Sequence, residues 1–292
     1  MVYSTKNYAL YFSREGKCTM DKKMYLFDCG SMWLDNSLIV ANSHLATSKN
    51  RSPAAEWTEI PVCVFLIDTP DGKILFDVGC DGVYQGSISP DADRVSPYVF
   101  TEQQLLPARL EECGVSFEDI KYVVVSHLHC DHIGYLHMCT NAEVFVNETE
   151  FIHAMKHYGL KRSYGAYTFN DFDNFLKARL NWTLIPDDEK FLEITEGVTI
   201  VNLGPGHSYG MLGLHVELKN SGNFFLVSDA LYTETNLGPP PRVAGIVHDT
   251  VGYVKTAGNI AKFAKEHKAQ IVFGHNMEQF RSMSEQTGGV FD

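Results

Sequence analysis

The sequence lacks the features that mark several classes of protein. Its seven cysteines are odd in number and include no Cys-x-x-Cys pair, so neither a disulfide framework nor a cysteine-rich zinc site is expected. The longest apolar runs, at 62–67 and 122–125, are far shorter than the roughly 20 residues that cross a bilayer. Basic residues are a minority, since 24 Lys plus Arg stand against 36 Asp plus Glu and give a formal charge of −12. We therefore expect neither a membrane span nor a nucleic-acid partner.

Signals of export and of division into domains are also missing. The first residues, MVYSTKNYALYFSREG, mix charged and polar side chains where an export signal needs an unbroken apolar core. Together with the unpaired cysteines, this favours a cytoplasmic protein. No repeat or long Pro/Gly/Ser linker divides the chain, and 45% hydrophobic residues suffice for a sizeable core. We expect residues 1–292 to form a single domain.

Short apolar segments alternate with segments of helical spacing. Apolar residues recur at helical intervals from Val254 to Ala264, after a candidate N-cap at Asp249 or Thr250. A shorter helix is predicted at 106–113, and residues 148–180 suggest a helical insertion rich in Phe and Tyr. Strands followed by helices in each half favour an α/β (α+β) sandwich with sheets inside and helices outside. The predicted strands are 24–29, 62–68, 73–78, 122–126, 143–147, 198–203, 211–217, 223–228 and 270–273.

The strongest chemical signal follows the strand predicted at 122–126. The segment Ser-His-Leu-His-Cys-Asp-His places His127, His129, Asp131 and His132 within six residues. Side chains at alternate positions of an extended segment point the same way, so the first three of these can converge while His132 turns in from the loop. Imidazole nitrogen and carboxylate oxygen are ligands for zinc and other first-row divalent ions. The segment therefore predicts a metal site for one ion, or for two if other parts of the chain contribute.

Three more candidate ligands stand just after predicted strands. His207 follows the strand that ends at Leu203, Asp229 follows the strand that ends near Val227, and His275 follows Phe273. Loops at strand ends hold functional side chains on a rigid support. The candidate set thus reaches seven ligands, which is enough for a two-metal site.

In combination, HLHCDH, GPGHS, SDALY and GHN, together with the upstream LFDVG, resemble the metallo-β-lactamase superfamily from about residue 24 to about 281. The resemblance implies a four-layer αββα sandwich with two metals at its edge, residues 1–23 then being an N-terminal extension. It implies that His127, His129 and His207 hold the first metal, that Asp131, His132 and His275 hold the second, and that Asp229 bridges both. The expected cofactor is two Zn²⁺, and Fe, Mn or Co are alternatives with the same ligand types.

Within that superfamily, the segment SDALYT and the early segment MYLFDCGS are similar to N-acyl homoserine lactonases and pyridoxolactonase-like relatives. The resemblance implies that Tyr232 contacts the substrate carbonyl or the leaving oxygen. It implies a quorum-quenching type of reaction, in which a hydroxide between two metals attacks the carbonyl of an N-acyl homoserine lactone. Asp131 or Asp229 would carry a proton during ring opening. The expected partner is a small lactone, and the chain is expected to be a monomer or homodimer.

Other residues are weaker candidates. Asp77 is expected to orient a ligating imidazole through its second nitrogen. Cys130 is expected to pack in the core rather than bind metal, and His248 is the one remaining histidine expected near substrate. Six apolar and aromatic residues could line a pocket, but packing in the core is the favoured expectation for them: Met32, Trp33, Leu34, Tyr164, Tyr167 and Phe169.

Several other functions stay open from the sequence. The same site could hydrolyse another lactone, a cyclic amide or a thioester in the manner of glyoxalase II. A phosphodiesterase is disfavoured because the charge of −12 provides no surface for tracking phosphates. A metal-stabilised binding protein and a di-iron redox protein are the alternatives outside hydrolysis.

Overall fold

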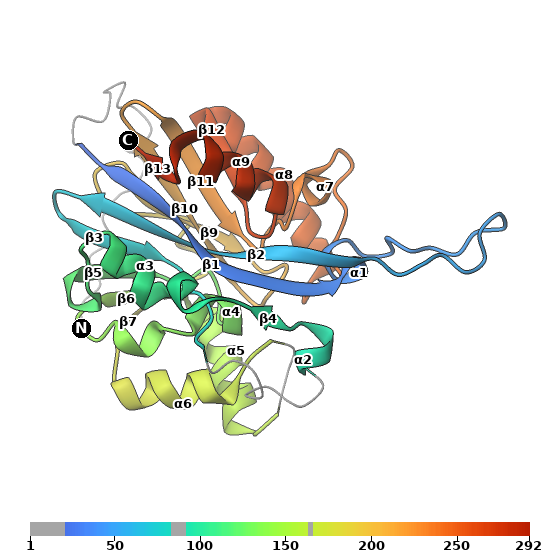
Figure 1. Ribbon diagram of the computed structural model, residues 1–292, viewed down its shortest axis with the longest axis horizontal. Helices are drawn as coiled ribbons and strands as arrows, with labels where there is room; N and C mark the ends of the chain where they lie inside the picture. Colours follow the sequence, from blue (N-terminus) through green and yellow to red (C-terminus); the bar gives the residue numbers. More distant parts are fainter. Residues whose placement is uncertain (1–20, 83–91, 163–165) are drawn as a thin grey trace.

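Two β-sheets pack face to face in the computed structural model, which describes residues 21–82, 92–162 and 166–292 (Figure 1). The first sheet has the strand order β13-β1-β2-β3-β5-β6-β7, and β4 pairs with β1. Its strands are β1 (Lys23–Asp35), β2 (Trp57–Thr69), β3 (Gly72–Phe76), β4 (Tyr98–Val99), β5 (Ile120–Val124), β6 (Glu143–Asn147), β7 (Asn181–Ile185) and β13 (Val290–Phe291).

The second sheet has the order β12-β11-β10-β9-β8. It is antiparallel except for the pair β11 and β12, which is parallel and therefore brings two strand carboxyl ends side by side. Its strands are β8 (Phe191–Thr195), β9 (Val198–Gly204), β10 (Met211–Leu218), β11 (Gly222–Ser228) and β12 (Ala269–Phe273).

The alternation of side chains along each strand builds two apolar layers. Along β2, Phe65 and Ile67 join the core between the sheets, whereas Val64 and Leu66 face the opposite, helix-covered side. From the second sheet, Leu214 and Leu226 enter the same core between the sheets. The sheets are also joined by a hydrogen bond of 2.9 Å from the Leu212 N–H to the Ser126 carbonyl. Packing thus fixes the position of the segment that begins at Ser126.

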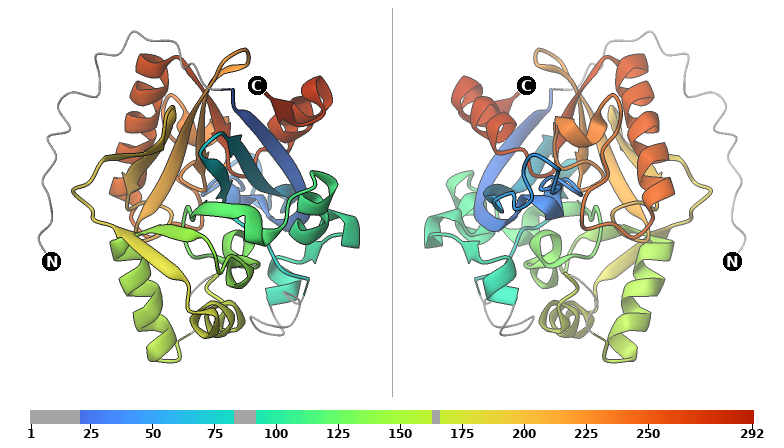
Figure 2. Two further views of the ribbon diagram at one scale, coloured as in Figure 1. Left: turned by 90° about the vertical axis from the view of Figure 1, so that its left-hand side faces the viewer. Right: turned by 90° about the vertical axis from the view of Figure 1, so that its right-hand side faces the viewer.

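Helices cover the outer faces of the sandwich (Figure 2). Helix α8 packs on β9, β11 and β12, whereas α9 lies on the opposite side against β2 and β13. No helix within the described ranges is both long and apolar enough to cross a bilayer. The α-helices are α1 (Asn36–Ile39), α2 (Ala92–Val95), α3 (Leu106–Glu112), α4 (Cys130–Ile133), α5 (Glu148–Gly159), α6 (Phe169–Ala178), α7 (Glu234–Leu237), α8 (Thr250–His267) and α9 (Met277–Thr287), and the 3₁₀ turns are η2 (Glu102–Gln104), η3 (Phe117–Asp119) and η4 (Leu136–Met138).

The expected sandwich of two sheets with helices outside is confirmed, although several boundaries differ. Strand β1 continues to Asp35, and its partner β2 begins as early as Trp57. A register shift between Asp28 and Ser31 lets the pairing of the two strands continue beyond the expected ends. Strands β4, β7, β8 and β13 were not expected. The helix expected around Val254 is confirmed as α8, with the Asp249 side chain accepting the Val251 N–H.

The expected helical insertion at 148–180 consists of α5 and α6. Helix α5 packs on β6 and β7, and α6 packs on η4. The expected extension at 1–23 lies outside the described residues except for its last three, and β1 begins at Lys23.

A buried acid in α6 makes stability depend on pH. Asp171 is 6% exposed, and burial, with Asp81 and Asp131 nearby, raises its pKa to about 7. The folded state keeps this proton up to about pH 7, whereas the unfolded chain releases it near pH 4. The contribution of Asp171 to the free energy of unfolding must therefore decrease as the pH rises from about 4 to about 7.

We expect Asp171→Asn, which cannot ionise, to be more stable than wild type at pH 8 by roughly 2–4 kcal/mol and similar to it near pH 4. The measurement is urea unfolding of both proteins across this pH range, because the difference between them isolates this one group. Asp188→Asn, at an exposed turn, is the control and should show no such difference. The prediction would be contradicted if the difference in unfolding free energy between wild type and Asp171→Asn stayed the same across this pH range.

Candidate metal centre

The candidate ligands meet where the carboxyl ends of four strands come together. His127 and His129 follow β5, and the short helix α4 carries Asp131 and His132. The other three follow β9, β11 and β12, whose ends are adjacent through the pairs β9–β10–β11–β12. All seven side chains are buried, at 8% exposure or less: His127, His129, Asp131, His132, His207, Asp229 and His275.

These residues form two groups, and within each group the potential ligand atoms lie within 4.8 Å of one another. The first contains His127, His129 and His207, and the second contains Asp131, His132, Asp229 and His275. In the first group the His207 Nε2 atom lies 2.9 Å from the His129 Nδ1 atom. In the second, the Asp131 Oδ2 atom lies 3.3 Å from His132 Nε2 and 3.5 Å from His275 Nε2.

The Asp229 carboxylate connects the two groups. Its Oδ1 atom faces the second group, at 3.3 Å from His132 Nε2 and 3.0 Å from His275 Nε2. Its Oδ2 atom faces the first group, at 3.4 Å from His207 Nε2 and 3.9 Å from His127 Nε2. One oxygen for each group is the arrangement that a bridging ligand requires.

The spacing and the missing hydrogen bonds both fit a pair of divalent ions. Tetrahedral ligands at zinc-like distances of about 2.0–2.1 Å stand about 3.3 Å apart, and the contacts above scatter around this value. Three buried atoms, His127 Nε2, His132 Nε2 and Asp229 Oδ1, have no hydrogen-bond partner among the described residues. Because burying such polar atoms without a partner is costly, a cation accounts for them best. The residues therefore fit a dinuclear divalent metal site.

Four of the five histidines use Nδ1 for an acceptor on the protein, which leaves Nε2 facing the centre. His132 Nδ1 lies 2.8 Å from Asp77, and His127 Nδ1 lies 3.0 Å from the Ser126 hydroxyl. His207 and His275 place Nδ1 3.0 Å from the carbonyls of Ile246 and Pro61. Such partners fix the tautomer and the ring orientation of a metal-binding imidazole.

Asp77 is confirmed in the orienting position expected for it. Its Oδ1 atom accepts the Ser126 N–H at 2.7 Å, and its Oδ2 atom accepts the Ser126 hydroxyl at 2.9 Å and the Ser228 hydroxyl at 3.3 Å. Ser126 and Ser228 each precede a candidate ligand, so Asp77 ties the ends of β5 and β11 to His132. These two serines were not predicted from the sequence, although each stands directly before a candidate ligand, His127 or Asp229.

Burial and neighbouring charges set the protonation of the ligands. Burial, with the other imidazoles, lowers the pKa of His127 well below its ordinary value and that of His129 to about 3. For Asp131, burial acts to raise the pKa, but the nearby His132 and His275 outweigh it and lower the pKa to about 2. At neutral pH His127, His129 and Asp131 therefore present lone pairs rather than protons. For His132 and His275, burial acts to lower the pKa, but the nearby carboxylates of Asp131 and Asp229 outweigh it and raise the pKa.

Tyr232 lies over the centre between the two groups. Its ring is 5.3 Å from that of His207 and 4.9 Å from that of His275, and its hydroxyl is 3.3 Å from His207 Nδ1. The side chain is 3% exposed, and burial, with Asp229 and Asp131 nearby, raises its pKa well above the ordinary value. The hydroxyl therefore keeps its proton and can donate a hydrogen bond.

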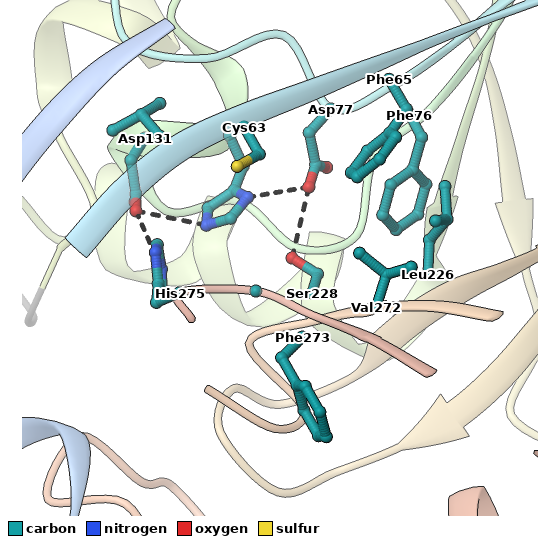
Figure 3. A pocket seen from close by; sticks show the side chains of 13 residues that line it. Cys63, Phe65, Phe76, Asp77, Asp131, Leu226, Ser228, Val272, Phe273 and His275 are labelled. Carbon is teal, nitrogen blue, oxygen red and sulfur yellow. Dashed lines mark hydrogen bonds and ion pairs between the residues drawn. The ribbon is translucent and has the colours of Figure 1, made fainter. Parts of the chain in front are cut away.

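A pocket extends from the second group into the space between the sheets (Figure 3). Asp131, His275 and Asp77 lie at its polar end, and Phe65, Phe76 and Leu226 lie at its apolar end. Cys63 also lines it beside Asp131, whereas Cys130 is 2% exposed and packs in the core as expected.

The remaining candidates divide between core and surface. Met32, Leu34 and Tyr167 are buried, whereas Trp33 and Phe169 are half-buried and Tyr164 lies outside the described residues. His248 is exposed, and its ring lies 3.8 Å from that of Tyr209. A buried residue that sequence reasoning missed is Glu150, which accepts backbone N–H groups from two ligand-bearing loops. The pattern Asn147-x-x-Glu150 indicates only a helix start.

The sequence of the chain matches one protein superfamily and is similar to the sequences of known lactonases. A family model described as Metallo-beta-lactamase superfamily matches residues 57–249. The N-acyl homoserine lactonase AiiB of Agrobacterium fabrum is 36% identical over 276 residues, which are 94% of this chain and 100% of that protein. The N-acyl homoserine lactonase of Bacillus thuringiensis is 29% identical over 277 residues, covering 89% of this chain and 96% of that protein.

Solved structures agree with these relatives. An N-acyl homoserine lactone hydrolase with N-hexanoyl-L-homoserine bound at its catalytic metal centre superposes with a TM-score of 0.74. It is 26% identical and covers 90% of this chain and 96% of its own. A quorum-quenching N-acyl homoserine lactone lactonase superposes with a TM-score of 0.72 at 26% identity, with 91% and 97% covered.

The contacts of Asp77 lead to a prediction about metal affinity. In Asp77→Asn, the amide NH₂ must face either the Ser126 N–H or the His132 ring N–H, so one acceptor is lost in either orientation. We expect metal affinity to fall about 10–100-fold. The measurement is competition for zinc with a chromophoric chelator, with circular dichroism to check folding. Asp68→Asn, at a half-exposed pair with Lys73, is the matched control, and equal zinc affinity in both variants would contradict the prediction.

Proposed function

The chain belongs to the metallo-β-lactamase superfamily, as its motifs implied, and we propose that it is a dinuclear metal-dependent hydrolase that opens the ring of N-acyl homoserine lactones. The observation that carries the proposal is the pair of ligand groups joined by Asp229, with the Tyr232 hydroxyl beside them. The N-acyl homoserine lactonases of Agrobacterium and Bacillus support the choice of substrate.

The proposed metal ligands are those of the two groups. His127, His129 and His207 would hold the first ion, and Asp131, His132 and His275 would hold the second, with Asp229 shared. Zinc is the proposed metal because three imidazoles and a carboxylate oxygen suit it well, and iron, manganese or cobalt accept the same ligands. When bound, two such ions supply an activated water and a Lewis acid for a carbonyl oxygen.

The proposed reaction is hydrolysis of the lactone ester bond. The oxygen of water forms a bond to the carbonyl carbon and the ring carbon–oxygen bond breaks. One proton of the water passes to the leaving oxygen and the other is released to solvent, which yields a carboxylate and an alcohol. Tyr232 would donate a hydrogen bond to the carbonyl oxygen or the leaving oxygen, where negative charge develops. Asp229, whose oxygens face both groups, or Asp131 of the second group would accept and return the proton.

The proposed location is the cytoplasm. Every cysteine that the structure describes is free, namely Cys29, Cys63, Cys80, Cys113, Cys130 and Cys139, as suits a reducing compartment. Burial raises the pKa of the Cys139 thiol to about 12 and that of the Cys63 and Cys80 thiols well above the ordinary value, so these three are poor nucleophiles.

The central test is turnover of defined substrates. Purified protein loaded with zinc should release acid from N-acyl homoserine lactones, and stripping the metal should remove this activity while readdition restores it. Aromatic lactones, a cyclic amide and a glutathione thioester are assayed in parallel. Asp229→Ala is the inactive control, because it removes the ligand shared by both groups. No acid from any acyl homoserine lactone, or faster turnover of the thioester, would overturn the proposal.

Tyr232→Phe tests the proposed donor. The hydroxyl lies 3.3 Å from His207 Nδ1 and belongs to neither ligand group, so metal content should stay as in wild type. We expect kcat to fall about 10²-fold because one donor to the developing charge is lost. Steady-state kinetics with a single acyl homoserine lactone make the measurement, and Tyr122→Phe on β5 is the control. An unchanged kcat would exclude Tyr232 from the reaction.

A further inference from the structure

Glu150 is a buried carboxylate that the proposed reaction does not use. It lies in the first turn of α5, where Asn147 caps the helix by accepting the Glu150 N–H at 2.9 Å. The residue has no exposed surface. A carboxylate in the first turn is favoured by the helix dipole, but complete burial still requires hydrogen bonds to compensate its charge. The identity of its donors therefore shows what this side chain holds in place.

Its two oxygens bond to two different loops. The Oε1 atom accepts the Leu128 N–H at 3.0 Å and the Tyr167 hydroxyl at 2.8 Å. The Oε2 atom accepts the Tyr209 N–H at 3.0 Å and the Gly210 N–H at 3.3 Å. Three backbone donors and a hydroxyl thus share one negative charge.

Both loops carry ligands of the first group. Leu128 stands between His127 and His129, and Tyr209 stands two residues after His207. The two loops follow strands of different sheets, and His129 and His207 are 78 residues apart in the chain, yet their imidazole nitrogens lie 2.9 Å from each other. Glu150 joins their backbones directly beside these imidazoles.

Close packing around Glu150 supports the same role. The Tyr167 ring, whose hydroxyl bonds to Glu150, lies edge-on to His129 at 5.0 Å. A Cβ atom on Gly210 would stand 1.9 Å from the Asn147 Oδ1 atom, so the loop after His207 sits directly on the start of α5. Asn147, Glu150 and Tyr167 therefore contact the two loops through side-chain packing as well as through hydrogen bonds to backbone.

We infer that Glu150 is a positioning residue that holds the loops 127–129 and 207–210 at the spacing the first metal needs, an inference that rests on the proposed function for the identity of that site. The segment that contains α5 and α6 then contributes to the position of the first ligand group, since it supplies both Glu150 and Tyr167. Glu150 acts through the backbone next to the ligands and does not contact the ligand atoms itself.

Glu150→Gln is the sharpest test because it preserves size and removes one acceptor. In either orientation the amide NH₂ faces backbone N–H groups, of Leu128 or of Tyr209 and Gly210, so one loop loses its bond. We expect zinc affinity to fall about 10-fold or more, the lower end of what orienting partners of metal ligands contribute. Glu148→Gln, in the same helical turn but half-buried, is the matched control and should bind zinc as wild type does.

The readouts are zinc affinity by chelator competition and the rise in melting temperature when zinc is added to metal-free protein. A general loss of stability would lower the melting temperatures of both forms equally, whereas a positioning role reduces the rise produced by zinc. Unchanged affinity and an unchanged rise in Glu150→Gln, or equal losses in Glu148→Gln, would overturn the inference. These measurements use no lactone, so their outcome is independent of whether the proposed substrate is correct.

Tyr167→Phe provides a second variant if Glu150→Gln does not fold. It keeps the ring against His129 and removes only the hydroxyl that bonds to Glu150. We expect a smaller loss of zinc affinity, about 3-fold, with the same reduced response to zinc on melting. Zinc affinity equal to that of wild type would then count against the inference.

Discussion

The Asp229 carboxylate is the constraint on which the rest of the site depends. It is 2% exposed, its oxygens face imidazoles on two sides, and Oδ1 has no hydrogen-bond partner among the described residues. A buried carboxylate in such surroundings is costly unless cations compensate it. The ends of β5, β9, β11 and β12 must all reach this one residue, and the parallel pairing of β11 with β12 places Asp229 directly beside the segment of His275. The apolar core between the sheets supplies the rigidity that this convergence requires.

Two further carboxylates keep the ligands in place without belonging to the ligand set. Asp77 bonds to Ser126, His132 and Ser228, and so joins the end of β5 to the end of β11. Glu150 bonds to Leu128, two residues further along the same ligand segment, and to Tyr209. The segment that carries His127 and His129 is thus held at two points, the N–H groups of Ser126 and Leu128, by acids that accept them. Bonds to the backbone beside His127 and His129 restrict the position of the chain that carries both imidazoles.

The candidate ligands could be predicted from the sequence because their signal is local. Four of them fall within six residues, and each of the others follows an apolar strand, so residue type and spacing sufficed. The resemblance then supplied the bridging role of Asp229 and the place of Tyr232. Glu150 could not be found in this way, because its partners are backbone N–H groups 22 to 60 residues away, and backbone donors leave no trace in residue type. Strands β7 and β8 were missed for a related reason: they are mostly half-buried and lack clean alternation, so tertiary pairing rather than local pattern determines them.

The charge of the chain and the chemistry proposed for the site are consistent with each other. Composition gives a net charge of −12, yet two divalent ions would bring +4 against the −2 of Asp131 and Asp229, so the centre itself would be electrophilic. A neutral lactone can approach such a centre without opposition from the acidic surface. The proposed reaction converts it into a carboxylate, which the centre attracts and the overall field of the protein repels. The negative charge of the chain thus favours release of an anionic product into solvent, and a site of this kind needs no basic surface to bind its substrate.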